Sequence, residues 1–525
     1  MRFLLIVIFI AALILNSCQE TTVTKEEVAA KLDTLEHKFE WLDYRISQEQ
    51  WDLYTRGFSD SLEFYTGLYN YTITDKELLR NLNLGKKYFN DEDNLRRYDL
   101  IYSSVLTGLI ESENNISALR DSLNKFDIIY RPNYNGEKTT QSSLYDLYRS
   151  SDNQLVREQS YRAWTQIGNE LADGLEQLFR LRNQQARTLG YNNYFALVFS
   201  QMEVDQPTYL KLLDRLDSLS RKPYQSILQG IRTQLRYDDV EVWDIAYAYK
   251  DINRKIDSYF PVDFQLDMVK SSLEKLGYDL DQLPIYFDLE AREGKSQFAY
   301  AFPIKPPYDV RVLANLTNGL YSTRVLMHEM GHALHATQIS QERALYTNSI
   351  ASAWGEGMAQ LIAAQCDEKD WLQNEANVPA DVADEYNKAK KEQDLVYLRT
   401  TLCRLMFEYE AYQNPNQDLN KLYWDLFEKY LFLPRHDDLK PWASLIYYIT
   451  HPVYMQNYLF ADIITAQSLN SIKRLYGYYS GNSLAGSFLT HNYFRFGSRY
   501  SWREMLKRGT DEDFNPDYLI EQLGI

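Results

Sequence analysis

The sequence predicts a mostly α-helical fold with one small β-hairpin. Apolar residues recur at helical spacing along nearly the whole chain, and helix start and stop signals separate the runs. One stretch, residues 296–316, instead alternates in the manner of two short strands joined by a proline turn. With 525 residues, 45% of them hydrophobic and 25% charged, the chain is long enough to bury a large core.

The chain begins with a stretch that predicts an export signal. Arg2 is the only charge before an apolar run over residues 3–15, and this run is too short to span a bilayer as a permanent helix. Cys18 follows leucine, asparagine and serine, an order that resembles the bacterial lipobox, in which the cysteine is lipidated. We expect a signal peptide (1–17) and a lipid-anchor tether (18–24) that holds the protein in a bacterial cell envelope, periplasmic or surface-exposed. A plain secreted protein is the alternative.

The helical runs follow in order from residue 24. Thr24 and Glu27 have the spacing of a capping box, and apolar residues continue at helical spacing to Leu42. Residues 127–136 have extended character and interrupt the helical pattern. We expect further helices over residues 49–70, 75–84, 91–112, 114–126 and 153–189, and another that starts at Asp205.

Charge and cysteine content exclude two classes of protein. The net charge is −17 and there is no basic cluster, so nucleic acid is not expected as a partner. Beyond Cys18 only Cys366 and Cys403 remain, which excludes a zinc module built from cysteines. These two thiols either form one disulfide or both stay free.

Two histidines stand four residues apart in the helical run around residue 330. On a helix His328 and His332 point from one face, so both imidazoles are able to bind one Zn²⁺. Glu329 directly follows the first histidine, the place of a general base in a metallohydrolase. A helix with two buried histidines is the alternative interpretation.

A catalytic zinc site needs a third protein ligand. The class of zinc peptidase with a third histidine is excluded, because the places of its glycine and histidine hold His335 and Gln338. Glu356 is the remaining candidate, since it stands just ahead of an apolar helical run with small neighbours, where an unpartnered carboxylate is costly to bury. Alternatively, Glu356 is a helix N-terminal carboxylate favoured by the helix dipole. His335 shares the face of the ligands and either supports them or simply packs.

Two further stretches have the properties that peptide hydrolysis requires. The hairpin offers an edge on which an extended peptide can lie, and the small Ala299 and Ala301 leave room for it; alternatively the hairpin only packs. Residues 447–462 are unusually aromatic, and a phenol or an imidazole there is able to donate a hydrogen bond to an oxyanion. Core packing is the alternative for each tyrosine.

Together these features resemble the angiotensin-converting-enzyme family of zinc peptidases, with thimet oligopeptidase and oligoendopeptidase F as close relatives. The resemblance covers residues 181–194, the hairpin, the histidine pair with Glu356, and residues 497–507. The 24 residues between His332 and Glu356 match the converting-enzyme spacing better than the longer oligopeptidase one. The resemblance implies that residues 25–525 form a single two-lobed helical shell around a deep central channel, with a small antiparallel sheet beside the zinc helix.

The resemblance also implies roles for individual residues. It assigns the ligands of one Zn²⁺ to His328, His332 and Glu356, and the general base to Glu329.

The family's transition-state tyrosine corresponds to Tyr458, and its histidine to His451. Ala299, Ala301 and Tyr454 are expected to contact the substrate.

Four residues depart from the converting-enzyme pattern. Ile449 replaces the lysine that binds a substrate's C-terminal carboxylate, so release of C-terminal dipeptides is not implied. Asn457 replaces a chloride-binding arginine, and Phe298 replaces a histidine. Gln360 replaces an aspartate that supports a zinc histidine, so that support must differ.

The predicted function is zinc-dependent hydrolysis of peptide bonds in short peptides, as a dipeptidyl carboxypeptidase or an oligopeptidase. The expected partners are a peptide substrate and, through the lipid anchor, a membrane, and the chain is expected to be a monomer. The rival is a lipid-anchored helical binding protein that captures oligosaccharides or peptides without catalysis. A pseudo-peptidase that binds zinc without cleaving is a third possibility.

Overall fold

The computed structural model describes residues 24–525 and confirms a mostly α-helical protein, with 71% of residues in helices. The predicted signal peptide and Cys18 lie outside the described residues. Within them, no helix combines the length and the apolar character needed to cross a bilayer.

The N-terminal helices begin with the predicted capping box. The Thr24 hydroxyl accepts a hydrogen bond from the Glu27 N–H, and the Glu27 carboxylate accepts one from the Thr24 N–H. The first helix is longer than predicted and the second begins later, because the chain leaves the helix only at Gly57, in the left-handed region (φ 81°). The helices of this region are α2 (Lys25–Arg56), α3 (Leu62–Ile73), α4 (Lys76–Gly85), α5 (Glu92–Glu111) and α6 (Asn114–Ile129).

A second group of helices follows a two-residue hairpin, β1 (Asn133–Tyr134) and β2 (Glu137–Lys138). The long helix predicted over residues 153–189 is in fact two helices that meet at Gln166. The second of them packs against the turn η6 (Pro441–Ser444), a contact that the local pattern does not reveal. The helices are α7 (Gln141–Ser150), α8 (Gln154–Thr165), α9 (Ile167–Thr188), α10 (Tyr194–Phe199), α11 (Gln206–Leu235), α12 (Val242–Ile245), α13 (Lys250–Asp257) and α14 (Val262–Lys275).

The predicted hairpin is part of a three-stranded sheet. Strands β4 (Tyr300–Lys305) and β5 (Asp309–Leu313) pair antiparallel, and β3 (Ile285–Asp288) pairs parallel to β5 on its other side. The antiparallel pair β4–β5 beside α15 is the predicted small antiparallel sheet, and β3 adds a parallel strand that was not predicted. The four-residue β3 was missed because so short a run carries no clear alternation. The strand order β3-β5-β4 leaves β4 at the edge.

The C-terminal half returns to helices. They are α15 (Leu320–Gln338), α16 (Ala344–Asn348), α17 (Ser352–Ala363), α18 (Lys369–Ala376), α19 (Ala380–Gln413), α20 (Leu419–Leu431), α21 (Tyr447–Thr450), α22 (Gln456–Tyr476), α23 (Ser483–Asn492), α24 (Trp502–Thr510) and α25 (Asp517–Leu523). Cys366 and Cys403 are both buried and both free, so the disulfide alternative is not realised.

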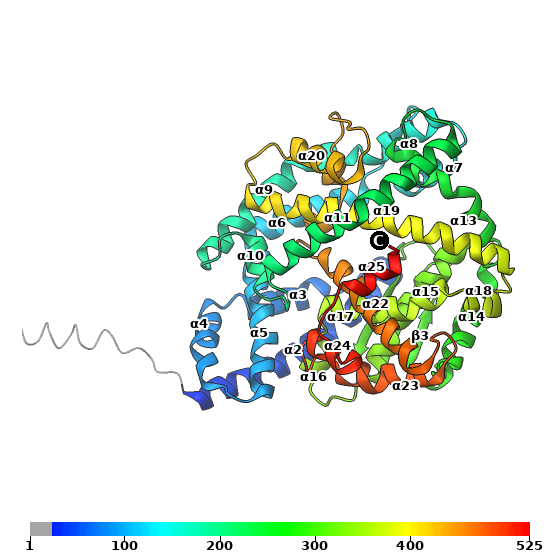
Figure 1. The fold of residues 1–525 in the computed structure, drawn as a ribbon. Helices are drawn as coiled ribbons and strands as arrows, with labels where there is room; N and C mark the ends of the chain where they lie inside the picture. The colour runs from blue at the N-terminus through cyan, green and yellow to red at the C-terminus, as the bar shows by residue number, and fades with distance from the viewer. Residues whose placement is uncertain (1–23) are drawn as a thin grey trace, which may run out of the picture.

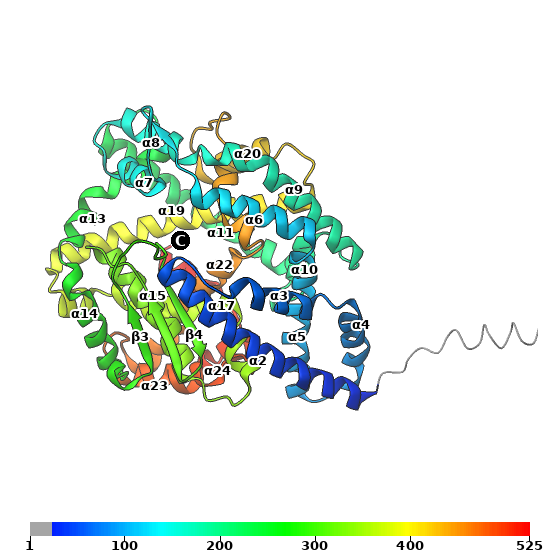
Figure 2. The same ribbon diagram turned by 180° about the vertical axis from the view of Figure 1, so that it is seen from behind.

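The helices form two layers, which Figure 1 shows one above the other. The upper layer contains α6 to α13 with α19 and α20, and the lower one contains the sheet, α14 to α18 and α22 to α24. Figure 2 shows α2 crossing in front of the sheet, where Trp51 and Tyr54 pack on Phe302. The sheet thus lies between α2 and the rest of the lower layer. The central channel implied by the resemblance stays a prediction.

Candidate metal centre

The histidine pair lies on α15, with Gly319 as its N-cap residue. The Leu320 N–H at the start of this helix donates to the Asp257 carboxylate, at 2.9 Å. His328 and His332 are one turn apart, and their ring centroids are 4.9 Å from each other with the planes nearly perpendicular. Both rings are partly exposed, so one face of the pair is open to water.

A close approach of two helices brings Glu356 to these rings. Gly331 packs on Ala359 of α17 so tightly that a Cβ atom added there would lie 2.5 Å from the Ala359 Cα. Glu356, at the start of α17, points its carboxylate at the pair. Its Oε2 lies 3.3 Å from His328 Nε2 and 4.0 Å from His332 Nε2.

This donor set fits a zinc ion. Two imidazole nitrogens and one carboxylate oxygen lie within 4.8 Å of one another. Ligands at about 2.0–2.1 Å from a tetrahedral Zn²⁺ are about 3.3 Å apart, and a catalytic zinc site takes three protein ligands. One pair, His328 Nε2 and Glu356 Oε2, already has this separation at 3.3 Å, and the others need to close by at most about 1.5 Å to reach it.

The protonation states also suit metal binding. Burial, with the charge of His328, lowers the pKa of His332 to about 4, so the imidazole is neutral at neutral pH. Burial opposes ionisation of Glu356, but the hydrogen bond to His328 and the neighbouring imidazoles hold its pKa below the usual value. A neutral imidazole and an ionised carboxylate are the forms that bind a metal.

Glu329 lies between the candidate metal ligands and the edge of the sheet. It is buried, and burial together with the charge of Glu356 raises its pKa to about 7, against the opposing effects of His328 and the Ala301 N–H. The Ala301 N–H donates to this carboxylate, so the edge of β4 faces the base. Ala299 directly precedes β4, and Phe298 before it is 71% exposed. The edge of β4 at Ala301 therefore lies beside the candidate metal site.

The aromatic stretch forms a cluster of four rings, Tyr447, His451, Tyr454 and Tyr458. Neighbouring ring centroids in this tyrosine cluster are 5.7–6.3 Å apart. Gly357 brings α22, which carries Tyr458, against α17, because a Cβ atom there would meet the Ile464 side chain at 3.0 Å. The same contact places the cluster next to Glu356.

Two hydrogen bonds define how the cluster meets the metal ligands. The Tyr454 hydroxyl donates to Glu356 Oε1 at 3.0 Å, leaving Oε2 to face the histidines. Tyr454, expected to contact substrate, thus contacts a predicted zinc ligand. The hydroxyls of Tyr458 and Tyr447 are hydrogen-bonded at 3.2 Å. Burial and the charge of Glu356 raise the pKa of both Tyr454 and Tyr458, so both remain hydrogen-bond donors.

The remaining predicted residues occupy different environments. His451 is exposed at the edge of the tyrosine cluster, and its Nδ1 lies 2.8 Å from the Thr450 hydroxyl. Gln360 hydrogen-bonds Asp462, one turn beyond Tyr458, and so does not support a zinc histidine. His335 is buried, stacks on Phe494, and its Nε2 has no partner among residues 24–525, which is the packed alternative.

Sequence reasoning missed Tyr447, Arg182 and Glu408 around this site. Tyr447 lies in the aromatic stretch 447–462, where core packing was the alternative for each tyrosine. Arg182 and Glu408 each lie on the buried face of a long helix, α9 and α19, whose other members are mainly apolar. A charged residue on an apolar stripe was the available signal.

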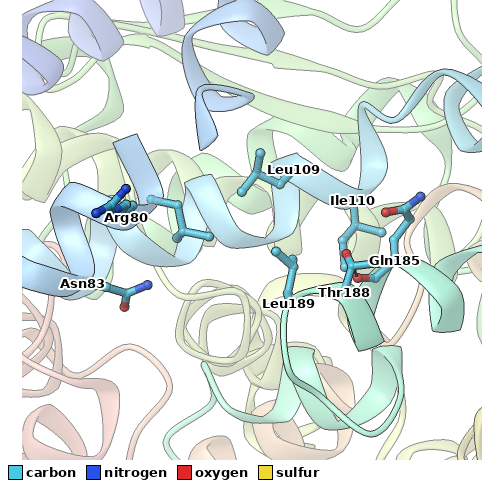
Figure 3. A pocket seen from close by; sticks show the side chains of 8 residues that line it. Arg80, Asn83, Leu109, Ile110, Gln185, Thr188 and Leu189 are labelled. Atoms are coloured by element: carbon cyan, nitrogen blue, oxygen red, sulfur yellow. Dashed lines mark hydrogen bonds between the residues drawn. The ribbon is translucent and has the colours of Figure 1, made fainter. Parts of the chain in front are cut away.

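A pocket lies away from the candidate metal centre, between α4, α5 and α9. It has a volume of about 390 Å³ and is shown in Figure 3. No histidine, carboxylate or thiol lines it, so it offers neither a metal site nor a base. Its lining residues are Leu79, Arg80, Asn83, Leu109, Ile110, Gln185, Thr188 and Leu189.

Comparison with known proteins agrees with the geometry. The family model described as "Peptidase family M3" matches residues 147–273 and 281–525, well over half of the chain. No curated protein matches the chain. The matched residues include both histidines, both glutamates and the whole tyrosine cluster.

Proposed function

The chain belongs to peptidase family M3, the family of thimet oligopeptidase and oligoendopeptidase F, and is therefore a metallopeptidase; we propose that it cleaves short peptides with one Zn²⁺. The observation that carries the metal assignment is the meeting of His328, His332 and Glu356 within 4.8 Å. The 24-residue spacing pointed towards the converting-enzyme family, so this spacing alone does not separate the two families.

Glu329 acts as general base in the proposed mechanism. When bound by His328, His332 and Glu356, zinc supplies a Lewis acid that polarises a carbonyl and acidifies a water. Glu329 accepts a proton from the attacking water and returns it to the leaving amine. Its buried position and a pKa of about 7 suit a group that must both take and give a proton near neutral pH.

The tyrosine cluster stabilises the oxyanion in the proposed mechanism. Tyr458 is the donor to the developing negative charge, and the hydrogen bond with Tyr447 orients its hydroxyl. His451 at the open edge of the cluster is a second donor. Tyr454 orients Glu356, and the edge of β4 at Ala299 and Ala301 binds the substrate main chain.

Cleavage as an oligopeptidase is favoured over release of C-terminal dipeptides. Ile449 takes the place of the converting enzyme's carboxylate-binding lysine, and it is fully buried and apolar. A substrate's C-terminal carboxylate therefore has no cation there. We expect a quenched peptide to be cleaved at a similar rate, within about threefold, with a free or an amidated C-terminus. A strict requirement for the free carboxylate would show the dipeptidyl activity instead.

Metal content and cleavage measured on one preparation test the proposal. We expect one zinc per chain and cleavage of an octapeptide library that stops after chelation and returns with added Zn²⁺. A protein that holds no zinc and retains peptides or oligosaccharides uncleaved would be the binding protein. Zinc without cleavage would be the pseudo-peptidase.

Export and lipidation at Cys18 form a separate proposal, which the leucine, asparagine and serine before this cysteine support. Growth with a labelled fatty acid should mark the wild-type chain and leave the Cys18→Ser chain unlabelled. Label on both chains would remove Cys18 as the lipidated residue.

A further inference from the structure

Most buried charges in residues 24–525 bind other parts of the scaffold. Arg157 pairs with Asp244, and Arg399 binds Asp217 and the Tyr430 carbonyl. Arg182 is different, because both carbonyls that it contacts belong to residues 447–455, which we call the tyrosine loop.

Arg182 of α9 binds the first part of the tyrosine loop. Its Nη1 donates to the Tyr448 carbonyl at 2.8 Å and its Nη2 to the Ile449 carbonyl at 2.7 Å. The other side of the guanidinium holds both carboxylate oxygens of Glu111, at 2.9 and 3.1 Å. Arg182 is fully buried, so these hydrogen bonds do not compete with water.

Glu408 of α19 binds the second part of the loop. Its Oε1 accepts a hydrogen bond from the Val453 N–H at 2.6 Å, and Glu408 is only 1% exposed. Val453 has φ 55°, a left-handed conformation that a β-branched residue adopts at a cost in free energy. Such a conformation persists only where the surroundings hold it, and it is typical of functional sites.

The two anchors flank His451, one of the two proposed oxyanion donors. The other donor, Tyr458, follows the loop on α22 and is hydrogen-bonded to Tyr447 of the loop. His451 lies between the anchored carbonyls and Val453, and Tyr454 directly follows Val453. Tyr454 then reaches Glu356 on α17, while both anchors come from α9 and α19 of the upper layer (Figure 1). The position of the donors relative to the proposed zinc ligands therefore depends on Arg182 and Glu408. These two buried side chains contact the backbone of the loop, but neither the donor groups nor the zinc ligands.

We propose that Arg182 and Glu408 are positioning residues. They hold the tyrosine loop so that His451, and Tyr458 through its hydrogen bond with Tyr447, face the transition state. The inference rests on the proposed function. Neither residue touches substrate or metal, so their loss should lower kcat and leave KM and zinc content nearly unchanged.

Two substitutions of Glu408 separate positioning from general stability. Glu408→Gln keeps an oxygen acceptor for the Val453 N–H, whereas Glu408→Leu removes it at similar volume. We expect Glu408→Leu to lower kcat by about 10- to 100-fold with KM within threefold and one zinc per chain, and Glu408→Gln to stay within threefold of wild type. Inhibition by a phosphinic peptide should weaken in parallel with kcat. Equal kcat for both variants would overturn the role of Glu408.

Two arginine substitutions provide a matched control, and they decide the question if the Glu408→Leu chain does not fold. Arg182→Lys and Arg399→Lys each keep a buried charge and lose several hydrogen bonds of a guanidinium, but only Arg182 touches the loop. Both should lower the melting temperature, and only Arg182→Lys should lower kcat and phosphinic-peptide affinity, about tenfold or more. Equal kcat losses in the two variants would show that stability alone is affected.

The outcomes also separate this inference from the proposed function. If wild-type protein neither binds zinc nor cleaves peptides, the proposed function is wrong. If wild type is active and the Glu408→Leu and Arg182→Lys chains retain its kcat, only the positioning role is wrong.

Discussion

The metal face and the tyrosine loop meet at one hydrogen bond, from Tyr454 to Glu356, but they are built differently. The metal face consists of His328, Glu329, His332 and Glu356, carried by two regular helices that touch at Gly331. The tyrosine loop contains only one short helix and a valine in the left-handed region. Its backbone is held by side chains 45 to 267 residues away in sequence.

A short sequence motif is able to specify the metal face but not the tyrosine loop. Helical spacing alone sets the two imidazoles on one face, so the metal face needs little beyond close helix packing. The loop has no such internal rule, and its geometry depends on buried groups from distant helices. Substitutions in the two halves should therefore have separable effects on zinc binding and on turnover.

The largest effect is expected from a substitution of Glu329, on the metal face. Glu329→Gln removes the proposed base but none of the three ligands, so it should keep one zinc per chain and lose about 10³-fold or more in kcat. Metal analysis and peptide cleavage on the same sample measure both. A variant that cleaves at the wild-type rate would remove Glu329 from the mechanism.

The next largest effect concerns Tyr458, which lies on α22 just after the tyrosine loop. Tyr458→Phe removes the proposed oxyanion donor and should lower kcat about 10²-fold, with KM and zinc content nearly unchanged. Steady-state kinetics with one quenched peptide measure this. The control is Tyr423, a half-buried tyrosine of α20 outside the site, and Tyr423→Phe should keep kcat. If Tyr458→Phe behaves like this control, the donor is another group.

The pH dependence of stability tests whether Glu408, which binds the tyrosine loop, is protonated in the folded chain. Burial raises the pKa of Glu408 to about 7, against the opposing Val453 N–H and Arg182, whereas the ordinary value is 4.5. Between these pH values the folded chain retains a proton that the unfolded chain has released. The contribution of Glu408 to the free energy of unfolding therefore falls as the pH rises from about 4.5 to about 7, by on the order of 2 kcal/mol.

The Glu408→Gln chain cannot titrate at this position. Between pH 4.5 and pH 7 its free energy of unfolding should therefore fall by about 2 kcal/mol less than that of the wild type. Urea unfolding of both chains at pH 5 and pH 7.5 measures the difference. Glu329 and Asp462, whose pKa values burial also raises to about 7, titrate in both chains and cancel. Parallel pH dependences in the two chains would mean that Glu408 is ionised throughout.

The smallest expected effect concerns the bond that joins the two halves. Tyr454→Phe removes the donor to Glu356 and should weaken zinc affinity about tenfold, since groups that orient metal ligands usually contribute that much. Competition with a chromogenic chelator measures it. Tyr447→Phe, which loses the bond to Tyr458 but none to Glu356, should bind zinc as wild type does. Equal affinities for all three chains would contradict an orienting role for Tyr454.

The contrast also explains what the sequence could predict. The mostly helical fold, the hairpin and the histidine pair follow from local spacing, so the sequence alone could predict them. The short strand β3, the break at Gln166 and the hydrogen bond of Tyr454 depend on partners far along the chain. Arg182 and Glu408 could not be assigned to the loop, because the only local signal is a charge on an apolar helix face.

The most direct test of the account is anomalous diffraction at the zinc edge from crystals of the zinc-loaded protein. We expect one peak, at a zinc ion bound by Nε2 of His328, Nε2 of His332 and the carboxylate of Glu356. A peak elsewhere, or a Glu356 carboxylate turned away from the ion, would contradict it.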